Sequence, residues 1–326
     1  MRPEWVLRFV ATVAVIGLLG LTLSGCAGQQ AKYPSKPIQV IVPYPAGGGV
    51  DVAARMVANY AEKYAGQKFV VVNKAGAGGE IGLTALAQAE PDGYTIGFTN
   101  LLAAITIAVK RGAECKYKME DFLPIANVVL DPGAVAVRAD SPWKDMNDLV
   151  NAAKANPGVI PVAYGGPGTT EAYTVSRVES QKGVTFNKIP FDGTAPMLAA
   201  LLGKHVDAVF MNASEALPNI KEGKVKLLGV GSAERSKVAP NIPTFKEQGF
   251  DIEQYASRGF IAPAKLDPAK ARTLAEIIKK VLDDPEFIKK AEESQLPLNY
   301  LDAEAFAKSI SSMNERLNKE WKTNPW

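Results

Sequence analysis

A strand, a glycine loop and a helix follow one another in residues 38–64, IQVIVPYPAGGGVDVAARMVANYAEKY. The run 38–42 is apolar and rich in β-branched residues, and it lies between two prolines, as is typical of a buried strand. Residues 44–51 contain three consecutive glycines, and in residues 52–64 the apolar positions recur every three or four residues, which predicts a helix. The stretch therefore predicts one strand–loop–helix unit of an α/β protein.

The same unit recurs twice more along the chain. Strands over residues 69–72 and 160–164 each run into a glycine-rich loop, and helices are expected after these loops, over about 81–89 and 169–181. Such alternation predicts a largely parallel sheet with helices on both faces. The other expected strands are 94–98, 186–190, 208–211, 227–230 and 260–261, and the other expected helices are 146–155, 195–202 and 271–282.

Three further details complete the expected element order. Two apolar runs, 125–130 and 134–137, surround Asp131-Pro132-Gly133. Thr194 is a good candidate for the N-cap of the helix that follows it, because its hydroxyl can accept a hydrogen bond from a free helical N–H. The last forty residues are charged and predicted to be helical.

The composition excludes several classes of protein. Of the 326 residues 47% are hydrophobic and 22% charged, and 37 basic residues face 34 acidic ones. A chain of this kind can fill a core, so it is neither disordered nor dependent on disulfides, and it has no charge excess that would favour nucleic acid. With one histidine, His205, a common zinc site is excluded, and we read His205 as a solvated turn residue.

No sequence motif marks a catalytic or cofactor site. The glycine loops lack the third glycine of a dinucleotide fingerprint, and the Lys-Ser/Thr pair of a nucleotide phosphate loop is missing. An enzyme would also require a nucleophile or an acid–base pair, which no motif indicates. We therefore expect no catalytic residue, no metal and no cofactor.

The N-terminus is predicted to be a targeting segment. An apolar run over residues 9–23 follows two arginines and ends in Leu-Ser-Gly-Cys at Cys26, which resembles a bacterial lipoprotein box. Residues 1–25 would then be the signal peptide, Cys26 would carry the lipid, and residues 26–32 would form a tether. An ordinary signal peptide, or an uncleaved anchor with an incidental cysteine, is the alternative. We expect an extracytoplasmic, lipid-anchored protein, in the periplasm or on the outer face of the cytoplasmic membrane.

The glycine loops at helix starts suggest how a ligand could be held. They lie at Gly47-Gly48-Gly49, Gly76–Gly79 and Gly165–Gly168, and ligands of open parallel sheets bind at the carboxyl ends of the strands. Glycine allows the backbone to approach a ligand, and the first N–H groups of a helix have no internal partner, so they can bind an anion. The hydroxyl groups of Thr169 and Thr170 could assist them. Tight turns without a ligand are the alternative.

Two acidic residues near these loops could each serve either a ligand or the local backbone. Asp51 could contact a ligand or cap the helix that begins beside it. Asp192 could select a cationic or hydroxyl group, or it could serve the turn before Gly193.

Several motifs together resemble the tripartite tricarboxylate transporter substrate-binding proteins, the TctC or Bug family. The match runs in order over nearly the whole chain after the tether. Its motifs are Tyr33-Pro-x-Lys-Pro-Ile-x-x-Ile-Val-Pro-Tyr44, Ala46-Gly-Gly-x-x-Asp51, Asn73-x-x-Gly-Ala-Gly-Gly-x-Ile-Gly82, Pro91-Asp-Gly-Tyr94, Leu123-Pro-Ile-Ala126, Pro190-x-x-Gly-x-Ala-Pro196, Leu201-Leu-Gly203, Val206-Asp207 and Pro243-Thr-x-x-Glu-x-Gly249.

The resemblance implies a fold similar to type II periplasmic binding proteins. Such proteins have two α/β domains joined by two crossing strands, and they close on a ligand in the cleft. Domain 1 would comprise residues 33–130 and 240–326, and domain 2 residues 131–239.

The resemblance also implies a function and a binding site. The protein would be a monomer that captures a small carboxylate, a dicarboxylate, tricarboxylate or aromatic acid, and delivers it to a two-subunit membrane permease. A sensor for a signalling partner and, less favoured, an α/β enzyme are the alternatives. The family's ligand contacts map to Tyr44, Ala46, Gly47, Gly48, Gly166, Thr169 and Thr170, and Asn100, Ala195, Asn212 and Ser214 are added because they end strands or start helices on the same rim.

Two positions depart from the family pattern. Glu171 begins a Glu-Ala-Tyr segment where the family often has a histidine, and Asp192 follows Phe191 where lysine is usual. The more acidic rim argues against a highly charged anion such as citrate.

Overall fold

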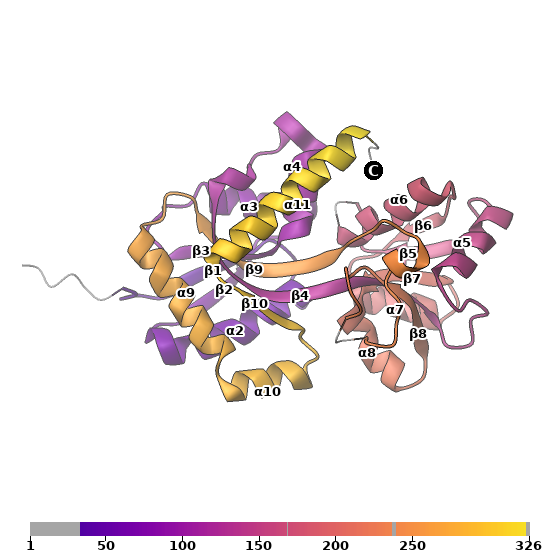
Figure 1. Cartoon of the computed structure of the whole chain (residues 1–326). Helices are drawn as coiled ribbons and strands as arrows, with labels where there is room; N and C mark the ends of the chain where they lie inside the picture. Colours follow the sequence, from indigo (N-terminus) through magenta and orange to yellow (C-terminus); the bar gives the residue numbers. More distant parts are fainter. Residues whose placement is uncertain (1–32, 168, 237–238, 324–326) are drawn as a thin grey trace, which may run out of the picture. The chain divides into compact units, whose positions relative to one another are not determined.

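The computed structural model describes residues 33–167, 169–236 and 239–323 (Figure 1). The predicted signal peptide 1–25, the lipidation site Cys26, the tether 26–32 and Gly168 lie outside these residues. Within the described part, no helix combines the length and the hydropathy that a membrane span requires.

The first strands and helices follow the predicted order, except that α4 was not predicted. β1 pairs in parallel with β2 on one side and with β3 on the other. β1 and β2 each end at a loop that leads into a helix, whereas β3 runs directly into α4. The bounds are β1 Ile38–Val42, α2 Gly49–Ala65, β2 Phe69–Asn73, α3 Glu80–Ala87, β3 Thr95–Asn100 and α4 Leu101–Arg111, with a short 3-10 turn at Ala77–Gly79 before α3.

A second group of strands is built in the same way. β5 pairs in parallel with β6 and β7. The bounds are α5 Met146–Ala155, β5 Pro161–Tyr164, α6 Thr170–Lys182, β6 Asn187–Pro190, α7 Thr194–Leu202, β7 Ala208–Asn212, α8 Ala213–Lys221 and β8 Val225–Val230. α7 begins at Thr194 itself, with Gly193 in the N-cap position at φ 104°, so the prediction that Thr194 caps this helix was wrong.

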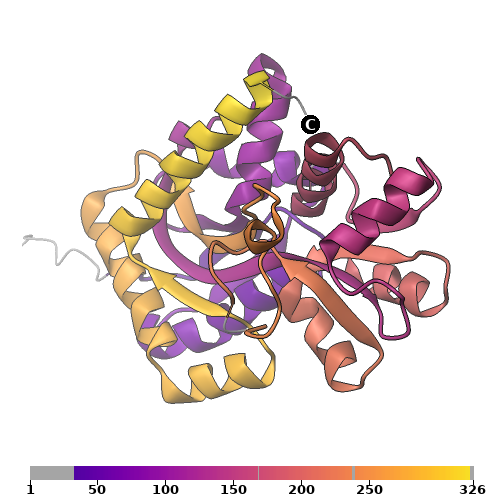
Figure 2. The same cartoon turned by 45° about the vertical axis from the view of Figure 1, so that its right-hand side comes forward.

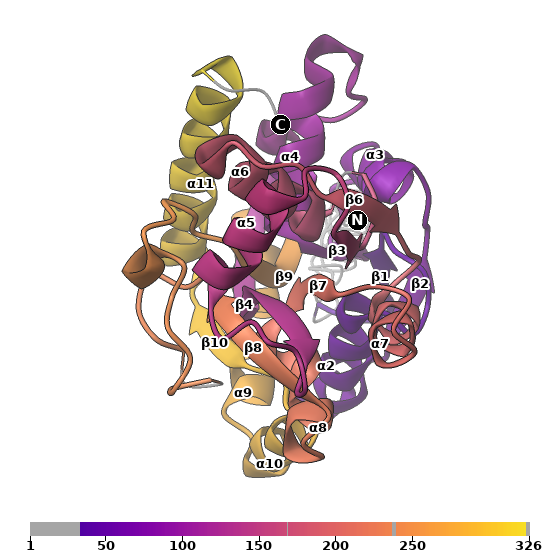
Figure 3. The same cartoon turned by 90° about the vertical axis from the view of Figure 1, so that its right-hand side faces the viewer.

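Alternating residues of the second group face helices on opposite sides. In β7, Ala208 and Phe210 pack with α5 and α6, whereas Val209 and Met211 pack with α7 and α8. Figure 3 shows these two pairs of helices on either side of the strands. Successive side chains of a strand point to opposite faces, so the apolar run buries both faces of the sheet.

Two long strands join the groups (Figure 1). β4 (Phe122–Arg138) and β9 (Tyr255–Pro263) are antiparallel neighbours, and β9 also pairs with β3. The last residues of β4 pair with β7 and β8. The sheet is therefore mixed, with parallel pairs at its ends and antiparallel pairs in its middle, in the order β2-β1-β3-β9-β4-β7-β5-β6.

β4 continues through Asp131-Pro132-Gly133, which the sequence placed between two separate runs. Asp131 and Pro132 lie opposite Ala256 and Tyr255 of β9. A Cβ atom at Gly133 would lie 1.3 Å from Oε1 of Gln254, so no larger residue fits where the chain crosses there. The Pro-Gly pair therefore accommodates a close packing contact inside the strand.

The C-terminal segment returns to the first group of strands. α9 (Pro268–Leu282) lies against α2, and α10 (Pro285–Glu293) follows it. β10 (Leu298–Leu301) pairs with β4, so the prediction that the last forty residues are helical throughout was wrong. α11 (Ala303–Thr323) runs beside α4 (Figure 2), and Phe306 and Leu317 of α11 share one buried cluster with Leu101 and Ile105.

Candidate functional site

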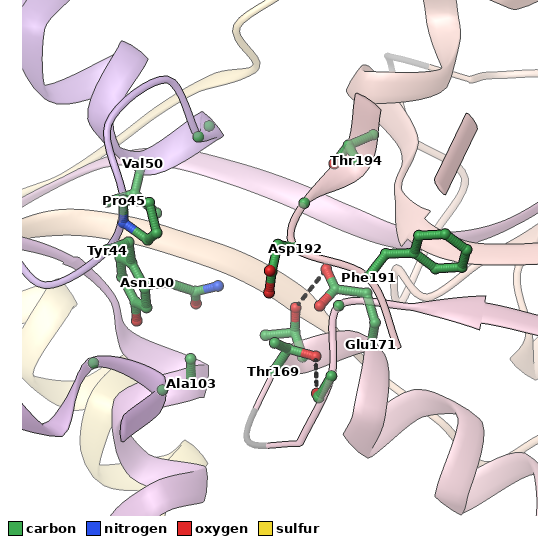
Figure 4. Close-up of a pocket in the computed structure, with 18 of the residues that line it drawn as sticks. Tyr44, Pro45, Val50, Asn100, Ala103, Thr169, Glu171, Phe191, Asp192 and Thr194 are labelled. Atoms are coloured by element: carbon green, nitrogen blue, oxygen red, sulfur yellow. Dashed lines mark hydrogen bonds between the residues drawn. The ribbon is translucent and has the colours of Figure 1, made fainter. Parts of the chain in front are cut away.

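One pocket of about 750 Å³ collects the starts of six helices. These helices are α2, α3 and α4 from the first group and α6, α7 and α8 from the second, and Figure 4 shows the two sets facing one another. The lining residues are Pro43, Tyr44, Pro45, Gly48, Gly49, Val50, Ala75, Gly76, Gly78, Gly79, Asn100, Ala103, Gly165, Gly166, Pro167, Thr169, Thr170, Glu171, Pro190, Phe191, Asp192, Gly193, Thr194, Met197, Asn212, Glu215 and Arg258.

Seven of the eleven predicted ligand-binding residues line this pocket, and four do not. Those in the lining are Tyr44, Gly48, Asn100, Gly166, Thr169, Thr170 and Asn212. Ala46 and Ala195 are exposed outside it. Gly47 donates its N–H to Asp51 Oδ2 at 2.9 Å, and Ser214 donates both its N–H and its hydroxyl to Asp131. The polar groups of Gly47 and Ser214 are therefore used within the protein.

Asp51 shapes the loop before α2. Its carboxylate accepts hydrogen bonds from the N–H of Gly47, from Nε of Arg55 at 3.0 Å and from Nδ2 of Asn73 at 2.9 Å. Burial raises the pKa of Asp51, but these hydrogen bonds outweigh burial and lower it overall. Asp51 does not line the pocket, so the structure favours the interpretation that Asp51 stabilises the start of α2 and does not contact a ligand.

The loop before α6 is held by its own hydroxyl groups. Thr169 is the N-cap, and its Oγ1 accepts from the N–H of Ala172 at 3.2 Å and donates to the carbonyl of Gly166 at 2.9 Å. Thr170 Oγ1 donates to Glu171 Oε1 at 3.1 Å. Both hydroxyl groups are therefore already engaged, and backbone N–H groups remain as the donors that this loop can offer an anion.

Two buried asparagines begin helices at the pocket. Asn100 is the N-cap of α4 and Asn212 the N-cap of α8, with exposed fractions of 8% and 4%. Oδ1 of each side chain is buried and has no hydrogen-bond partner. A buried polar atom without a partner costs free energy, and both unsatisfied oxygens belong to side chains that line the pocket.

Tyr44 supplies a neutral hydroxyl group. Its Oη lies 3.4 Å from Thr99 Oγ1. Burial raises the pKa of Tyr44 to about 12, so the phenol stays protonated at neutral pH.

The cation of the pocket is Arg258, which the sequence analysis missed. It is 4% exposed in β9, with Nη2 3.5 Å from Glu215 Oε1 and 3.9 Å from Asp131 Oδ2. Its guanidinium group lies at the start of α2, because a Cβ atom at Gly49 would be 3.1 Å from Nη1. A lone arginine inside the apolar run YASRGFIAP was the signal that could have identified it.

Three carboxylates also line the pocket, Glu171, Asp192 and Glu215. Glu215 accepts a hydrogen bond from the hydroxyl of Thr194 at 2.9 Å. Thr194 makes this contact and does not cap α7. Burial, followed by the charge of Glu215, raises the pKa of Glu171. His205, in contrast, is exposed and does not line the pocket.

A mixed α/β sheet with a pocket formed by helix starts on both sides of two long strands is the arrangement of a periplasmic binding protein. The chain belongs to the tripartite tricarboxylate transporter receptor family, since the family model described as "Tripartite tricarboxylate transporter family receptor" matches residues 53–322. The resemblance drawn from the motifs is thereby confirmed. The family consists of solute-binding receptors and is not an enzyme family.

Individual relatives agree with this assignment. The UPF0065 protein in the gbd 5' region of Cupriavidus necator is 33% identical over 300 residues, which cover 90% of this chain and 89% of that protein. A TctC solute binding protein from Polaromonas, solved without ligand, is 34% identical with a TM-score of 0.72, over 89% of this chain and 99% of that one. MatC from Rhodopseudomonas palustris, solved with bound malate, is 26% identical with a TM-score of 0.77, over 88% of this chain and 99% of that one.

Proposed function

We propose that this protein is an extracytoplasmic receptor that binds a small carboxylate in the 750 Å³ pocket and delivers it to a permease of the tripartite tricarboxylate type. The observation that carries the proposal is the convergence of six helix starts on one pocket. The first N–H groups of each helix lack internal partners, and the helix dipole adds partial positive charge there. A carboxylate is held well by such groups even where few side-chain cations are present. The malate bound by MatC agrees with this chemistry.

We propose that the chain moves as two domains close to the predicted residues 33–130 with 240–326 and residues 131–239. The exception is residues 240–254, which move with the second domain, because Phe245, Phe250 and Ile252 pack in its buried cluster. β4 and β9 would be the hinge strands, because each runs from one group of elements to the other. Both groups contribute to the pocket, α2 to α4 on one side and α6 to α8 on the other. A ligand that contacts both sides favours the closed state, whereas one that contacts a single side has no such effect.

The proposal also covers the processing of the N-terminus, the lipid anchor and the oligomeric state. We propose that residues 1–25 are removed, that Cys26 carries the lipid and that the receptor works as a monomer beside the membrane. The lipoprotein-like Leu-Ser-Gly-Cys ending supports this placement, and the family description supports a permease partner.

A thermal-shift screen of the refolded protein against a library of carboxylic acids tests the proposal, because refolding removes any retained ligand. We expect at least one small acid to raise the unfolding midpoint and to bind in calorimetry without being consumed. Steady turnover of that acid would contradict the receptor function. The absence of any stabilising acid would contradict carboxylate binding.

Gly48→Val tests the position of the site. Gly48 lines the pocket with φ −73°, and a Cβ atom there would meet only the Pro45 carbonyl oxygen, at 3.6 Å. The variant should therefore fold normally but bind the selected acid at least tenfold more weakly. Gly48→Ala, which adds one methyl group, should reduce the affinity less.

A further inference from the structure

The pocket carries more acidic than basic side chains. Glu171, Asp192 and Glu215 line it, and Arg258 is the only cation among its described lining residues. Arg258 also lies within 4 Å of Asp131, a fourth carboxylate that is fully buried behind the lining. Its charge is therefore already shared between Glu215 and Asp131.

The oxygen atoms at one side of the pocket also indicate a need for hydrogen-bond donors, because Glu171 and Asp192 both line it. Figure 4 shows Glu171 beside Asp192, and the Asn100 side chain extending toward Asp192 from the opposite side with its amide nitrogen nearest. A ligand group beside Glu171 and Asp192 would meet carboxylate oxygens that accept hydrogen bonds, and a carboxylate cannot donate to them.

Charge favours the same conclusion. A second ligand carboxylate placed near Glu171 and Asp192 would bring like charges together in a partly desolvated space, which is unfavourable. An ammonium group there would neutralise the acidic side chains and donate up to three hydrogen bonds. The start of α2 differs from the acidic side, because the first N–H groups of a helix lie there beside the Arg258 guanidinium. Arg258 nevertheless also faces Glu215 and Asp131, and the Gly47 N–H is taken by Asp51.

We propose that the ligand is zwitterionic, with a carboxylate held by the start of α2 and Arg258 and a protonated amine held by Glu171 and Asp192. The inference rests on the proposed carboxylate-binding function and narrows its ligand class to amino acids and related amino carboxylates. It assigns to Glu171 and Asp192 a role in selecting the ligand.

Matched pairs of acids that differ only by an amine provide the test. The pairs are succinate with aspartate, glutarate with glutamate, adipate with 2-aminoadipate, and butanoate with 4-aminobutanoate, each measured by thermal shift and then by calorimetry. We expect the amino member of at least one pair to bind at least tenfold more tightly than its partner. Glu171→Gln and Asp192→Asn should each reduce that preference at least tenfold while leaving the protein folded.

Glu222→Gln is the matched control, because Glu222 is an exposed carboxylate at the far end of α8. It should keep the full preference. Tighter or equal binding of the amine-free acid in every pair that binds would overturn the inference and leave the proposed function standing. The absence of any shift with these eight acids would also overturn the inference, and the wider acid library would then decide the proposed function. Binding of an amine without a carboxylate, such as putrescine, in place of every acid would overturn both.

Discussion

Asp131 is a fully buried carboxylate near the crossing of the two long strands. It accepts hydrogen bonds from the N–H and the hydroxyl of Ser214, and Arg258 Nη2 lies 3.9 Å away. Burial raises the pKa of Asp131 from 3.8 to about 6, although Arg258 and Ser214 act in the opposite direction. Burial therefore destabilises the charged form of Asp131 by more than Arg258 and Ser214 stabilise it.

The raised pKa of Asp131 predicts that the free energy of unfolding depends on pH through this residue. Between about pH 4 and pH 6 the folded protein keeps the proton on Asp131 while the unfolded chain has released it, so this contribution to the free energy of unfolding falls as pH rises. The loss should approach about 3 kcal/mol, at about 1.4 kcal/mol per pKa unit. We expect the free energy of unfolding of the wild type minus that of Asp131→Asn to decrease over this range in urea titrations.

Asp140→Asn provides the comparison, because Asp140 is exposed beside Arg138 and undergoes the same chemical change. The wild type minus Asp140→Asn difference, measured over the same range, is the baseline for an exposed Asp-to-Asn change. A wild-type minus Asp131→Asn difference that rises with pH would show that Arg258 dominates and that the pKa of Asp131 is lowered instead.

Among the elements, the loops before α2, α3 and α6 could be predicted because glycine marks them. Gly47, Gly76 and Gly166 all have positive φ, a conformation that other residues adopt at a cost. α4 was not predicted: Leu101–Val109 is an almost fully buried apolar run that follows a strand without a break, and its charged residues stand only at its end. α8 is short and contains Pro218, which argues against a helix. Asn100 and Asn212 were nevertheless found, since strand ends alone place residues on the rim.

The charges of the pocket were harder to predict than its backbone. Glu215 lies in the unpredicted helix α8, and Arg258 reaches the pocket from a strand whose pairing with β4 links residues more than a hundred positions apart. The sequence pattern gives the local period of a strand but not its partner. The acidic rim was therefore expected from Glu171 and Asp192, while the buried ion pairs behind it were not.

The N-cap of α6 gives a prediction at the level of one element. Thr169→Ala removes the oxygen that accepts from the Ala172 N–H, which should cost about 1 kcal/mol of stability. The same change frees the first turn of α6 at the pocket wall, so affinity for the acid found by screening should fall as well. Thr169→Ser keeps the oxygen and should preserve both properties. Chemical denaturation and calorimetry measure the two effects.

Asp145→Ala separates binding from capping. Asp145 caps α5 by accepting from the Asp148 N–H at 2.9 Å, and it does not line the pocket. This variant should lose about as much stability as Thr169→Ala but keep its affinity. Equal losses of affinity in both variants would mean that Thr169 affects binding through general stability alone.

At the scale of the whole molecule, the C-terminal helix connects the two groups of elements. α11 packs along α4, yet its Glu320 accepts a hydrogen bond from the Tyr173 hydroxyl of α6 at 2.8 Å, and Arg177 Nε lies 3.8 Å from the same carboxylate. α6 carries the pocket residues Thr169 and Thr170 at its start. A residue close to the C-terminus therefore helps to position one wall of the pocket.

Glu320→Ala should release this connection. Glu320 is 19% exposed and Tyr173 is 2% exposed, so the variant removes a partly buried hydrogen bond, at a cost of about 1 kcal/mol. For a protein of this size, that loss lowers the midpoint of thermal unfolding by a few degrees. Glu315→Ala is the matched control, because Glu315 is an exposed residue of the same helix with no ion pair or hydrogen bond from its side chain among the described residues. The same midpoint in both variants would show that the contact between α11 and α6 contributes nothing to stability, and the pocket wall would then have to be held by α4 and the sheet alone.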